Sequence, residues 1–400
     1  MLGGVEDGPE QGEVQLITAK SLVHRFRYVL RTQACWVASL IVGFFILISI
    51  LSWQQPVNPS GWGCDAKMSP PHASNRVVNK VFCQKHDLVT YSNSKILSTF
   101  ASQGMDPVRF MVIGDFGRDG YCCQLDVAHE MSRCALAVQP NFVINVGDAF
   151  YTHGLLSPQE EQVKTSFENV YLQYDNLRVP WFSALGNHEY RGSAEAVLQL
   201  SRNFSEYFTM EARFWDRTVQ TSTTKVHLFF LDTTPMIAAY KTAGYDEDGD
   251  DSMLNQPDGF LTQNVSQQLE WFERRLELSV GENEVRIVIG HHPPFTSGSH
   301  HGEDDKFLRN TLSPLLEKYK VSAYIGGHDH SSQEYLKQNT YYFVSGTGSM
   351  TDGEFSQSDE NLRFFSEQNG FLAVDVTSVQ ITVCFVNTVG EVLRTTKIPL

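Results

Sequence analysis

Five short runs of this sequence end in side chains that commonly bind metal ions. Each run has apolar residues, then Gly, then a polar side chain; the runs are VIGDFG, VINVGDAFY, FSALGNHEY, VIGHHPPF and YIGGHDH. The seven candidate ligands that they supply are Asp115, Asp148, Tyr151, Asn187, His291, His328 and His330. One such turn alone is usually a helix cap or a structural turn. Five of them, each after a buried apolar run, indicate one shared metal site.

The ligand types indicate which metals this site would hold. None of the five runs contains cysteine, which argues against a thiolate zinc site or an iron–sulfur cluster. Carboxylates, imidazoles, an amide and a phenol suit Fe(III), Fe(II), Mn(II) or Zn(II). Because a tyrosine must lose its proton to bind well, Tyr151 favours a hard trivalent ion. One shared carboxylate would hold two metals about 3.5–4 Å apart.

Buried strands must position these turns. Apolar and β-branched runs predict strands at 108–113, 142–146, 181–185, 225–231, 285–289 and 323–325. Apolar residues at helical spacing predict helices over 127–138, 163–174, 265–276 and 308–319. Further strands at 341–345, 371–376, 380–386 and 392–398 follow without helices. This order predicts a layered α/β domain with two sheets, an antiparallel C-terminal end, and a site beyond the carboxyl ends of the strands.

In this order, the blocks GDFG, GDAFY, GNHE, GHHP and GHDH resemble those of the metallophosphoesterase superfamily. Tyr151, three residues after Asp148, makes the chain similar to the purple acid phosphatases, particularly the small, tartrate-resistant, single-domain type. The resemblance runs from about Val108 to the C-terminus. It implies a four-layer αββα sandwich with two mixed β-sheets, and an acid phosphatase that hydrolyses phosphate monoesters.

The resemblance also implies a role for each ligand. A ferric ion would be bound by Asp115, Asp148, Tyr151 and His330. A divalent ion (Fe, Zn or Mn) would be bound by Asp148, Asn187, His291 and His328, so that Asp148 bridges the two ions. A metal-bound hydroxide would attack phosphorus. Protonated His188 or His300, which match the family's histidines beside the substrate, would stabilise the developing charge or protonate the leaving group.

Four positions depart from the pattern of the small enzymes. Phe116 stands where Trp is usual, Ala149 where Asn is usual, and Glu189 where Asp is usual. Met236 lies near the place of a disulfide cysteine, so that bridge is expected to be missing. None of the four is a predicted ligand. They bear on substrate preference and leave metal binding intact.

Composition and charge exclude other classes of protein. The chain has 400 residues, of which 42% are hydrophobic and 12% aromatic, so it can bury a large core and is not intrinsically disordered. Its formal net charge of −15 argues against a nucleic-acid partner. A phosphate ester would also be repelled at long range, so bound metal must supply the local positive charge.

An uncharged apolar run from Ala34 to Trp53 predicts a transmembrane signal anchor. As a helix it would span roughly 30 Å, the thickness of the hydrocarbon core of a bilayer. Four basic residues precede it, namely Lys20, Arg25, Arg27 and Arg31, and the next one after it is Lys67. This asymmetry leaves residues 1–33 in the cytoplasm and the rest outside, as in a single-pass type II membrane protein. A cleaved signal peptide and a buried core helix are the alternatives; the long leader and the lack of an A-x-A site favour the anchor.

The remaining chain divides into a stalk and lead-in segment at 54–105 and a catalytic domain at 106–400. We expect this part to be lumenal or extracellular, in the secretory pathway, a lysosome-like compartment or at the cell surface.

Six of its cysteines are compatible with disulfides, namely Cys64, Cys83, Cys122, Cys123, Cys134 and Cys384. Cys123 and Cys134 should not pair, because a helix carrying both would separate their Cα atoms by roughly 16 Å. Asn203 and Asn264 begin glycosylation sequons. The acidic run 246–251 predicts a solvated loop, with a calcium site as the weaker alternative.

Two other functions stay open. A phosphodiesterase, nucleotidase or phosphoprotein phosphatase could use the same binuclear scaffold, although most such relatives lack the Tyr ligand. A non-catalytic, membrane-tethered interaction module is the remote alternative, because such proteins usually lose ligands and this chain keeps all seven. The sequence sets neither the oligomeric state nor the substrate, a small molecule or a phosphoprotein.

Overall fold

The computed structural model describes residues 100, 106–241, 259–279, 284–300, 306–351 and 355–400. All of them belong to one unit, Trp62–Leu400. The predicted tail, the anchor at 34–53, most of the lead-in segment and the acidic run 246–251 lie outside the described residues. Within the described ranges, no helix combines the length and the apolar character that crossing a membrane requires.

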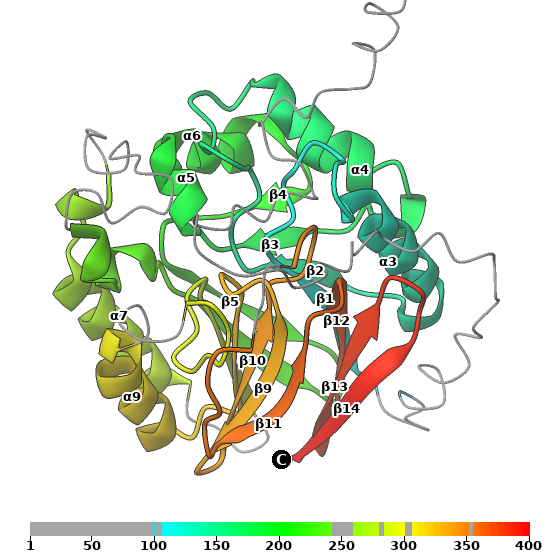
Figure 1. The fold of residues 1–400 in the computed structure, drawn as a ribbon. Coiled ribbons are helices and arrows are strands. Elements are labelled where there is room, and N and C mark those ends of the chain that lie inside the picture. The colour runs from blue at the N-terminus through cyan, green and yellow to red at the C-terminus, as the bar shows by residue number, and fades with distance from the viewer. Residues whose placement is uncertain (1–99, 101–105, 242–258, 280–283, 301–305, 352–354) are drawn as a thin grey trace, which may run out of the picture. The chain divides into compact units, whose positions relative to one another are not determined.

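Two mixed sheets, each of seven strands, form the centre of this unit (Figure 1). The first sheet has the order β14 (Val392–Pro399), β13 (Gln380–Asn387), β12 (Gly370–Val376), β1 (Val108–Ile113), β2 (Phe142–Asn145), β3 (Trp181–Ser183) and β4 (Phe208–Thr209). The second has the order β11 (Leu362–Ser366), β9 (Ser332–Lys337), β10 (Thr340–Ser345), β8 (Ala323–Gly326), β7 (Glu284–Ile289), β6 (Lys225–Phe230) and β5 (Trp215–Gln220).

Parallel strands form one half of the first sheet, out to its edge at β4, and the middle of the second sheet. Strands β1 to β4 pair in parallel in the first sheet, and β10, β8, β7 and β6 do so in the second. The flanking strands pair antiparallel, including the predicted C-terminal set β12, β13 and β14. Since the carboxyl ends of parallel strands meet at one edge, each sheet presents a row of loops suited to a site.

Helices accompany the sheets. The α-helices are α3 (Gln124–Val138), α4 (Asn169–Tyr171), α5 (Asn187–Arg191), α6 (Ala194–Gln199), α7 (Val265–Leu278) and α9 (Ser313–Lys318). Single turns of π-helix are η1 (Val163–Glu168), η3 (Leu200–Phe204) and η8 (Leu308–Leu312). Short 3₁₀ turns are η2 (Asp175–Leu177), η4 (Thr234–Met236), η5 (Ala239–Lys241) and η7 (Phe260–Thr262).

The layering follows from the alternation of buried side chains along the strands. On β7, Val285 and Ile287 pack into the core that also contains the first sheet and the apolar face of α3. Val288, which points to the other face, packs into a second core with Phe272 of α7 and Leu316 of α9. The two sheets therefore share one core, and helices cover the outer faces (Figure 1). The predicted α/β sandwich with two mixed sheets is confirmed.

The predicted strands are all present, with ends that differ by no more than about two residues, as is usual for sequence-based boundaries. Four strands were not predicted. β4 is very short, and β5 and β11 are edge strands without a continuous apolar run. β9 reads SQEYLK and is buried at its polar residues, because Glu334 accepts hydrogen bonds from Arg394 and Thr396 of β14. Hydrogen bonds to a distant strand thus allow β9 to be buried without the apolar run from which a buried strand is predicted.

The helix predictions hold for α3 and α7, whereas 163–174 and 308–319 each begin with a π turn. Cys134 on α3 is a buried free cysteine, which agrees with the expectation that it does not pair with Cys123. The α-helix α5 was not predicted, because its short sequence NHEYR has no apolar periodicity.

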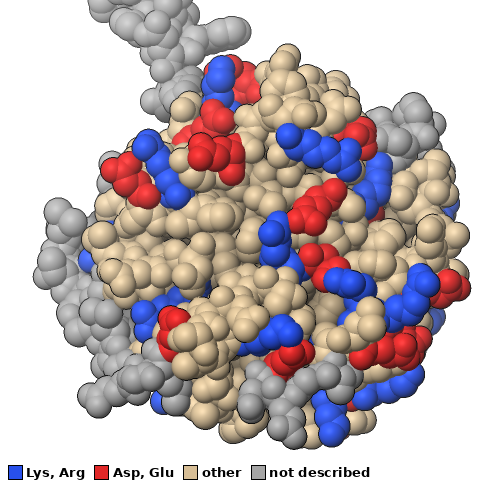
Figure 2. All heavy atoms as spheres, turned by 180° about the vertical axis from the view of Figure 1, so that it is seen from behind, with Lys and Arg blue, Asp and Glu red and all other residues tan. Residues whose placement is uncertain are grey.

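The face of the molecule in Figure 2 carries Lys and Arg side chains interspersed with Asp and Glu. On that face, charges of one sign do not gather into an extended basic surface of the kind that nucleic acids bind. The mixture is typical of a solvated surface.

One carboxylate of α3 is buried in the core. Glu130 is 1% exposed; Oε2 accepts a hydrogen bond of 2.7 Å from Arg133, and Oε1 has no hydrogen-bond partner among the residues that the structure describes. Burial raises the pKa of Glu130 to about 7, although the charge of Arg133 opposes this. The unfolded chain, with a pKa near 4.5, releases this proton more readily than the folded protein.

The free energy of unfolding should therefore fall as pH rises from about 4.5 to about 7. Glu130→Gln removes the buried charge, so its unfolding free energy should fall less than that of the wild type between about pH 5 and about pH 8. Chemical denaturation at both pH values measures this. Glu161→Gln, at an exposed glutamate, is the control and should follow the wild type. Equal pH dependence of the two variants would contradict the assignment.

Candidate metal centre

The predicted ligands lie just beyond the carboxyl ends of five strands that belong to both sheets. Asp115 follows β1, Asp148 and Tyr151 follow β2, Asn187 follows β3, His291 follows β7, and His328 and His330 follow β8. The structure brings all seven together, and none is more than 8% exposed. Side chains separated by more than 200 residues thus form one buried polar cluster in a largely apolar interior.

The first set of donors surrounds the hydroxyl of Tyr151. This oxygen lies 3.1 Å from Asp115 Oδ1, 3.0 Å from Asp148 Oδ2 and 2.9 Å from His330 Nε2. Two carboxylates, a phenol and an imidazole therefore converge on one point. These four residues are the predicted ferric ligands.

The second set surrounds His291 Nε2. This nitrogen lies 3.0 Å from Asn187 Oδ1 and 3.3 Å from Asp148 Oδ2, and the ring of His328 is 5.2 Å away between centroids. His291 Nδ1 donates a hydrogen bond to the carbonyl of Val146, so Nε2 is the ring nitrogen that faces the cluster. Asp148 belongs to both sets, so the two sets overlap at the residue predicted to bridge.

Three of the ligand residues have left-handed backbone. The φ angles of Asp115, Asp148 and His328 are 59°, 54° and 69°, values that residues other than glycine rarely adopt. The carboxylate of Asp115 accepts a hydrogen bond of 3.0 Å from the backbone N–H of His328. A ligand of the first sheet thus holds the turn that carries a ligand of the second sheet.

The glycines just before the ligands lie in close contact with the side chains of ligands on neighbouring turns. A Cβ on Gly186 would lie 2.1 Å from Asp148 Oδ1, and one on Gly327 would lie 2.4 Å from Asp115 Oδ2. Contacts this short are not possible, so a larger residue would displace the ligand. The Gly-then-ligand pattern therefore reflects packing between turns.

Glu189 holds two of the turns in register. Its Oε2 accepts hydrogen bonds from the N–H groups of Asp148, at 3.0 Å, and Gly186, at 2.6 Å, and its Oε1 accepts one of 2.8 Å from Ala149. The sequence marked Glu189 only as a departure from the family pattern. In the structure its carboxylate joins the turn after β2 to the turn after β3.

The electrostatics of the cluster favour a bound cation. Burial lowers the pKa of His291, but the charges of Asp148 and Asp115 outweigh this and raise it to about 9. Burial and the same two carboxylates raise the pKa of Tyr151 well above its ordinary value. A buried site that draws protons to its ligands is one in which a metal would replace those protons. The ligand atoms of Asp115, Asp148 and His291 lie within 4.8 Å of one another, which fits a binuclear metal site.

The two predicted substrate-side histidines lie in different surroundings. The ring of His188 packs 4.2 Å from that of Tyr151, and its Nδ1 donates to the carbonyl of Thr152. Burial, together with the charges of Arg191 and Arg118, lowers the pKa of His188 well below its ordinary value, which disfavours the protonated form expected from the sequence.

His300 is half-buried at the rim of the site, where its ring lies 4.2 Å from that of His328. Its Nδ1 is 3.6 Å from Asp329 Oδ1. Neither His300 nor His188 belongs to the donor sets around Tyr151 and His291, and both lie beside them.

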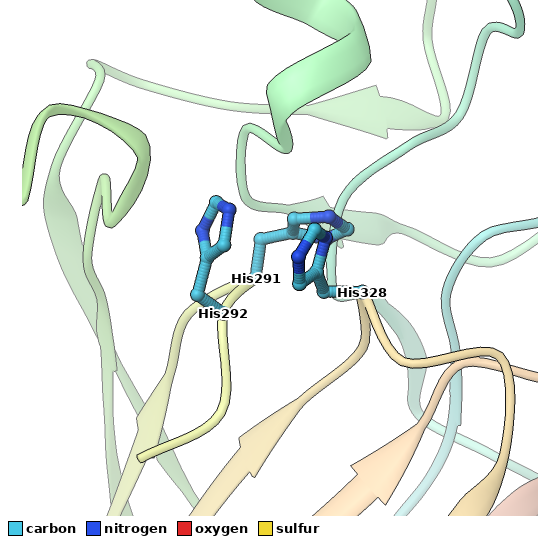
Figure 3. A group of neighbouring side chains, drawn as sticks. All are labelled: His291, His292 and His328. Carbon is cyan, nitrogen blue, oxygen red and sulfur yellow. The ribbon is translucent and has the colours of Figure 1, made fainter. Parts of the chain in front are cut away.

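His292 is a buried neighbour of the cluster that the sequence did not single out. Figure 3 shows His291 and His292 projecting from the loop after β7 in different directions, with His328 next to His291. His292 Nδ1 lies 2.9 Å from Thr233 Oγ1, and its Nε2 lies 2.9 Å from the hydroxyl of Tyr240. Both ring nitrogens are thus used, so His292 packs behind His328 as a support, although its nitrogens are near enough for a metal. In the sequence, the second histidine of GHHP was the feature that could have indicated His292.

Arg118 is the other residue that the sequence did not indicate. Its guanidinium lies 3.8 Å from the centroid of the Tyr151 ring, and its Nε donates a hydrogen bond of 3.1 Å to Ser349. A cation held over the ring of a predicted phenolate ligand stabilises negative charge on that ring. A single Arg after GDFG gives no pattern that predicts this contact.

Comparison with known proteins gives consistent results. Residues 108–332 match the model of the calcineurin-like phosphoesterase family. The chain is 34% identical over 293 residues to purple acid phosphatase 4 of Arabidopsis thaliana, covering 72% of this chain and 82% of the relative. It is 26% identical to the human (Homo sapiens) tartrate-resistant acid phosphatase type 5, covering 76% and 94%.

Solved structures share the fold. GAP50, described as the anchor in the inner membrane complex of Plasmodium, superposes with a TM-score of 0.62 at 21% identity and covers 74% of this chain and 89% of its own. A purple acid phosphatase from yellow lupin (Lupinus luteus) seeds has a TM-score of 0.54 at 14% identity, covering 74% and 54%.

Gly186→Ala tests the packing of glycine against a ligand. Its Cβ would force Asp148 to move, so metal affinity should fall by roughly 10- to 100-fold, as when other groups that orient a ligand are lost. Metal content per chain after dialysis measures this. Gly370→Ala is the control: its Cβ would lie 2.1 Å from the Val386 carbonyl, on β12 and away from the ligands, so it should lower stability and keep metal. Full metal content in folded Gly186→Ala protein would refute the assignment.

Proposed function

The chain belongs to the purple acid phosphatase family of the calcineurin-like phosphoesterases and is an acid phosphatase, and from this premise we propose that it is a membrane-anchored enzyme that hydrolyses phosphate monoesters at a binuclear Fe(III)–M(II) centre. The observation that carries the proposal is the pair of overlapping donor sets that share Asp148. One set includes the hydroxyl of Tyr151, and a phenolate is a ligand that favours a ferric ion.

We assign the ligands as the family pattern implies. The ferric ion would be held by Asp115, Asp148, Tyr151 and His330, and the divalent ion, Fe, Zn or Mn, by Asp148, Asn187, His291 and His328. When bound, the two ions supply positive charge for the phosphate oxygens and lower the pKa of water at the site. Arg118, over the ring of Tyr151, adds positive charge of the protein's own beside the cluster.

The protein's own residues then divide the proton transfers. Because Nδ1 of His188 donates to the Thr152 carbonyl, and burial lowers the pKa of the ring, Nε2 presents a lone pair that accepts a hydrogen bond. The proton for the leaving oxygen is therefore assigned to His300, whose Nδ1 lies 3.6 Å from the carboxylate of Asp329. The two histidines have opposite roles because their surroundings differ.

The substrate class separates this proposal from its enzymatic alternatives. A phosphodiesterase, a nucleotidase or a phosphoprotein phosphatase would use the same scaffold. Tyr151 favours the purple acid phosphatase type, because most of those other enzymes lack this ligand. Phe116 and Ala149, which replace the usual Trp and Asn, lie in the turns that carry the ligands and are both buried. Their side chains pack inside these turns. The rates at which the enzyme hydrolyses a panel of phosphate esters measure its substrate preference.

The membrane and compartment are part of the same proposal. We propose that residues 34–53 anchor the chain as a type II membrane protein, with the phosphatase domain lumenal or extracellular. Disulfides at Cys122 and Cys123, which we propose, would fit an oxidising compartment. The sequon residues Asn203 and Asn264 are exposed, which supports N-glycosylation.

A non-catalytic tethered module is the remaining alternative. Its fold relative GAP50 is described as a membrane-complex anchor, but at 21% identity this likeness concerns the fold alone. Against it stands the burial of all seven predicted ligands in one cluster. A tethered module without catalysis would have no need of bound metal, so metal content distinguishes the two.

The full-length protein in detergent should contain one iron and one divalent metal per chain and show a visible tyrosinate–iron absorption band. His330→Ala should abolish phosphatase activity and this band together, because His330 Nε2 lies 2.9 Å from the Tyr151 hydroxyl. His227→Ala, at a half-buried histidine paired with Glu284 on β6 and β7, is the control and should keep both. A His330→Ala protein that retains its colour, or two zinc ions without colour in the wild type, would reject the ferric assignment.

Membrane anchoring has its own test. In cells, the wild type should resist alkaline carbonate extraction, whereas a chain that begins at Gln54 behind a cleavable signal should be secreted. Enzymatic removal of N-glycans should reduce the apparent mass of both forms, and Asn203→Gln with Asn264→Gln should remove that shift. Carbonate extraction of the full-length chain would contradict the anchor, and an unchanged mass would contradict glycosylation.

A further inference from the structure

Asp329 is a buried carboxylate that lies between two predicted ligands and belongs to neither donor set. It stands in the turn GHDH after β8, between His328 and His330, and is fully buried. His328 has left-handed backbone, so this turn is not an extended strand and strand alternation does not set where its side chains lie. The contacts of Asp329 show where its side chain lies.

Both oxygens of Asp329 contact the segment 296–300, which follows the His291 turn. Oδ1 accepts a hydrogen bond of 3.1 Å from the backbone N–H of Ser299 and lies 3.4 Å from its hydroxyl. Oδ2 accepts a hydrogen bond from the hydroxyl of Thr296. One carboxylate thus binds the segment at two points, on either side of its middle residue.

The middle residue, Gly298, lies directly against this carboxylate. A Cβ at Gly298 would be 2.2 Å from Asp329 Oδ1 and 2.6 Å from its Cγ. Only glycine lets the backbone approach so closely. The segment is therefore fitted to the carboxylate by contact as well as by hydrogen bonds.

A second side chain completes the support. Gln333 Nε2 donates to Thr296 Oγ1 at 3.1 Å and lies 3.3 Å from Asp329 Oδ2, while its Oε1 accepts a hydrogen bond of 2.8 Å from the N–H of Ser297. The Tyr335 hydroxyl donates a hydrogen bond to the same Oε1 and lies 2.8 Å from Ser297 Oγ. Buried groups that are each hydrogen-bonded make a rigid network.

The segment ends at His300, and its position follows from these contacts. His300 Nδ1 lies 3.6 Å from Asp329 Oδ1 and 3.3 Å from Ser299 Oγ. Because Nδ1 is on the side of the carboxylate, Nε2 is on the opposite edge of the ring. The ring itself lies 4.2 Å from that of His328, beside the donor cluster.

We propose that Asp329 is a positioning residue that fixes the segment 296–300 against the ligand turn and thereby sets the place and orientation of the His300 ring. The inference rests on the proposed function, in which His300 serves the leaving group. Within the GHDH turn, His328 and His330 then bind the metal ions, and Asp329 positions the segment that carries the general acid His300. A geometric error of about 1 Å at such a group is enough to slow a reaction by roughly 100-fold.

The test is Asp329→Asn in the full-length protein. Asparagine keeps the size of the side chain, but its Nδ2 cannot accept the hydrogen bonds that one carboxylate oxygen accepts now. Amide hydrogen exchange of Ser297 and Ser299 should become about 10-fold faster or more, whether or not metal is bound. For a phosphate monoester, kcat should fall roughly 10- to 100-fold with little change in KM.

A double-mutant cycle separates positioning from a general loss of structure. His300→Ala should lower kcat by roughly 100-fold or more. Asp329→Asn added to it should lower kcat by less than about 3-fold further, because its effect passes through His300. If the two effects multiply, or if Asp329→Asn leaves kcat unchanged, the proposal is wrong.

Controls keep these outcomes interpretable. Asp375→Asn changes another buried aspartate, whose partner Arg109 lies at the opposite end of β1 from the site, and should leave kcat and the exchange at 297–299 unchanged. Should Asp329→Asn fail to fold, Thr296→Val removes one hydrogen bond from the carboxylate and should show the same coupling to His300 at a smaller size. If the wild type lacks phosphatase activity, the proposed function is wrong. Unchanged amide hydrogen exchange of Ser297 and Ser299 in Asp329→Asn would separately contradict the positioning role.

Discussion

Two buried carboxylates, Asp115 and Asp148, are the constraint on which the rest of this structure depends. Both are at most 1% exposed and both contact the hydroxyl of Tyr151. Burying such charges is costly unless they are compensated. Here backbone N–H groups and imidazoles provide part of the compensation, and the raised pKa of His291 shows that the cluster still attracts positive charge. A pair of metal ions is the compensation that the donor set fits.

The position of these carboxylates also explains why two sheets are needed. Asp115 comes from the first sheet, yet it accepts a hydrogen bond from His328 of the second and packs on Gly327. In the other direction, a Cβ on Gly147 of the first sheet would lie 2.6 Å from His291 of the second. The centre is therefore where the sheets are held together, and a change in their relative register would separate the ligands. The shared apolar core fixes that register.

The rim shows how one residue type acquires two roles. His188 is held by the Thr152 carbonyl, and burial lowers the pKa of its ring. His300, whose side chain is exposed to a similar degree (14% against 12% for His188), lies near the carboxylate of Asp329. The groups beside each ring thus distinguish residues that the sequence could only group together. The same tertiary effect explains why Glu189, a departure in one motif, joins two turns.

The sequence by itself determined the parts that depend on local order: the apolar strands, the turns after them, and the residue types that those turns carry. Strand periodicity and the Gly-then-ligand pattern are short-range, so they can be read without the fold. It did not predict β9, whose polar Glu334 is stabilised by Arg394 sixty residues away, nor the contact of Arg118 with Tyr151. Only the tertiary structure decided which oxygen faces which nitrogen and in which direction the pKa of each histidine shifts, because burial and contacts between distant segments set both.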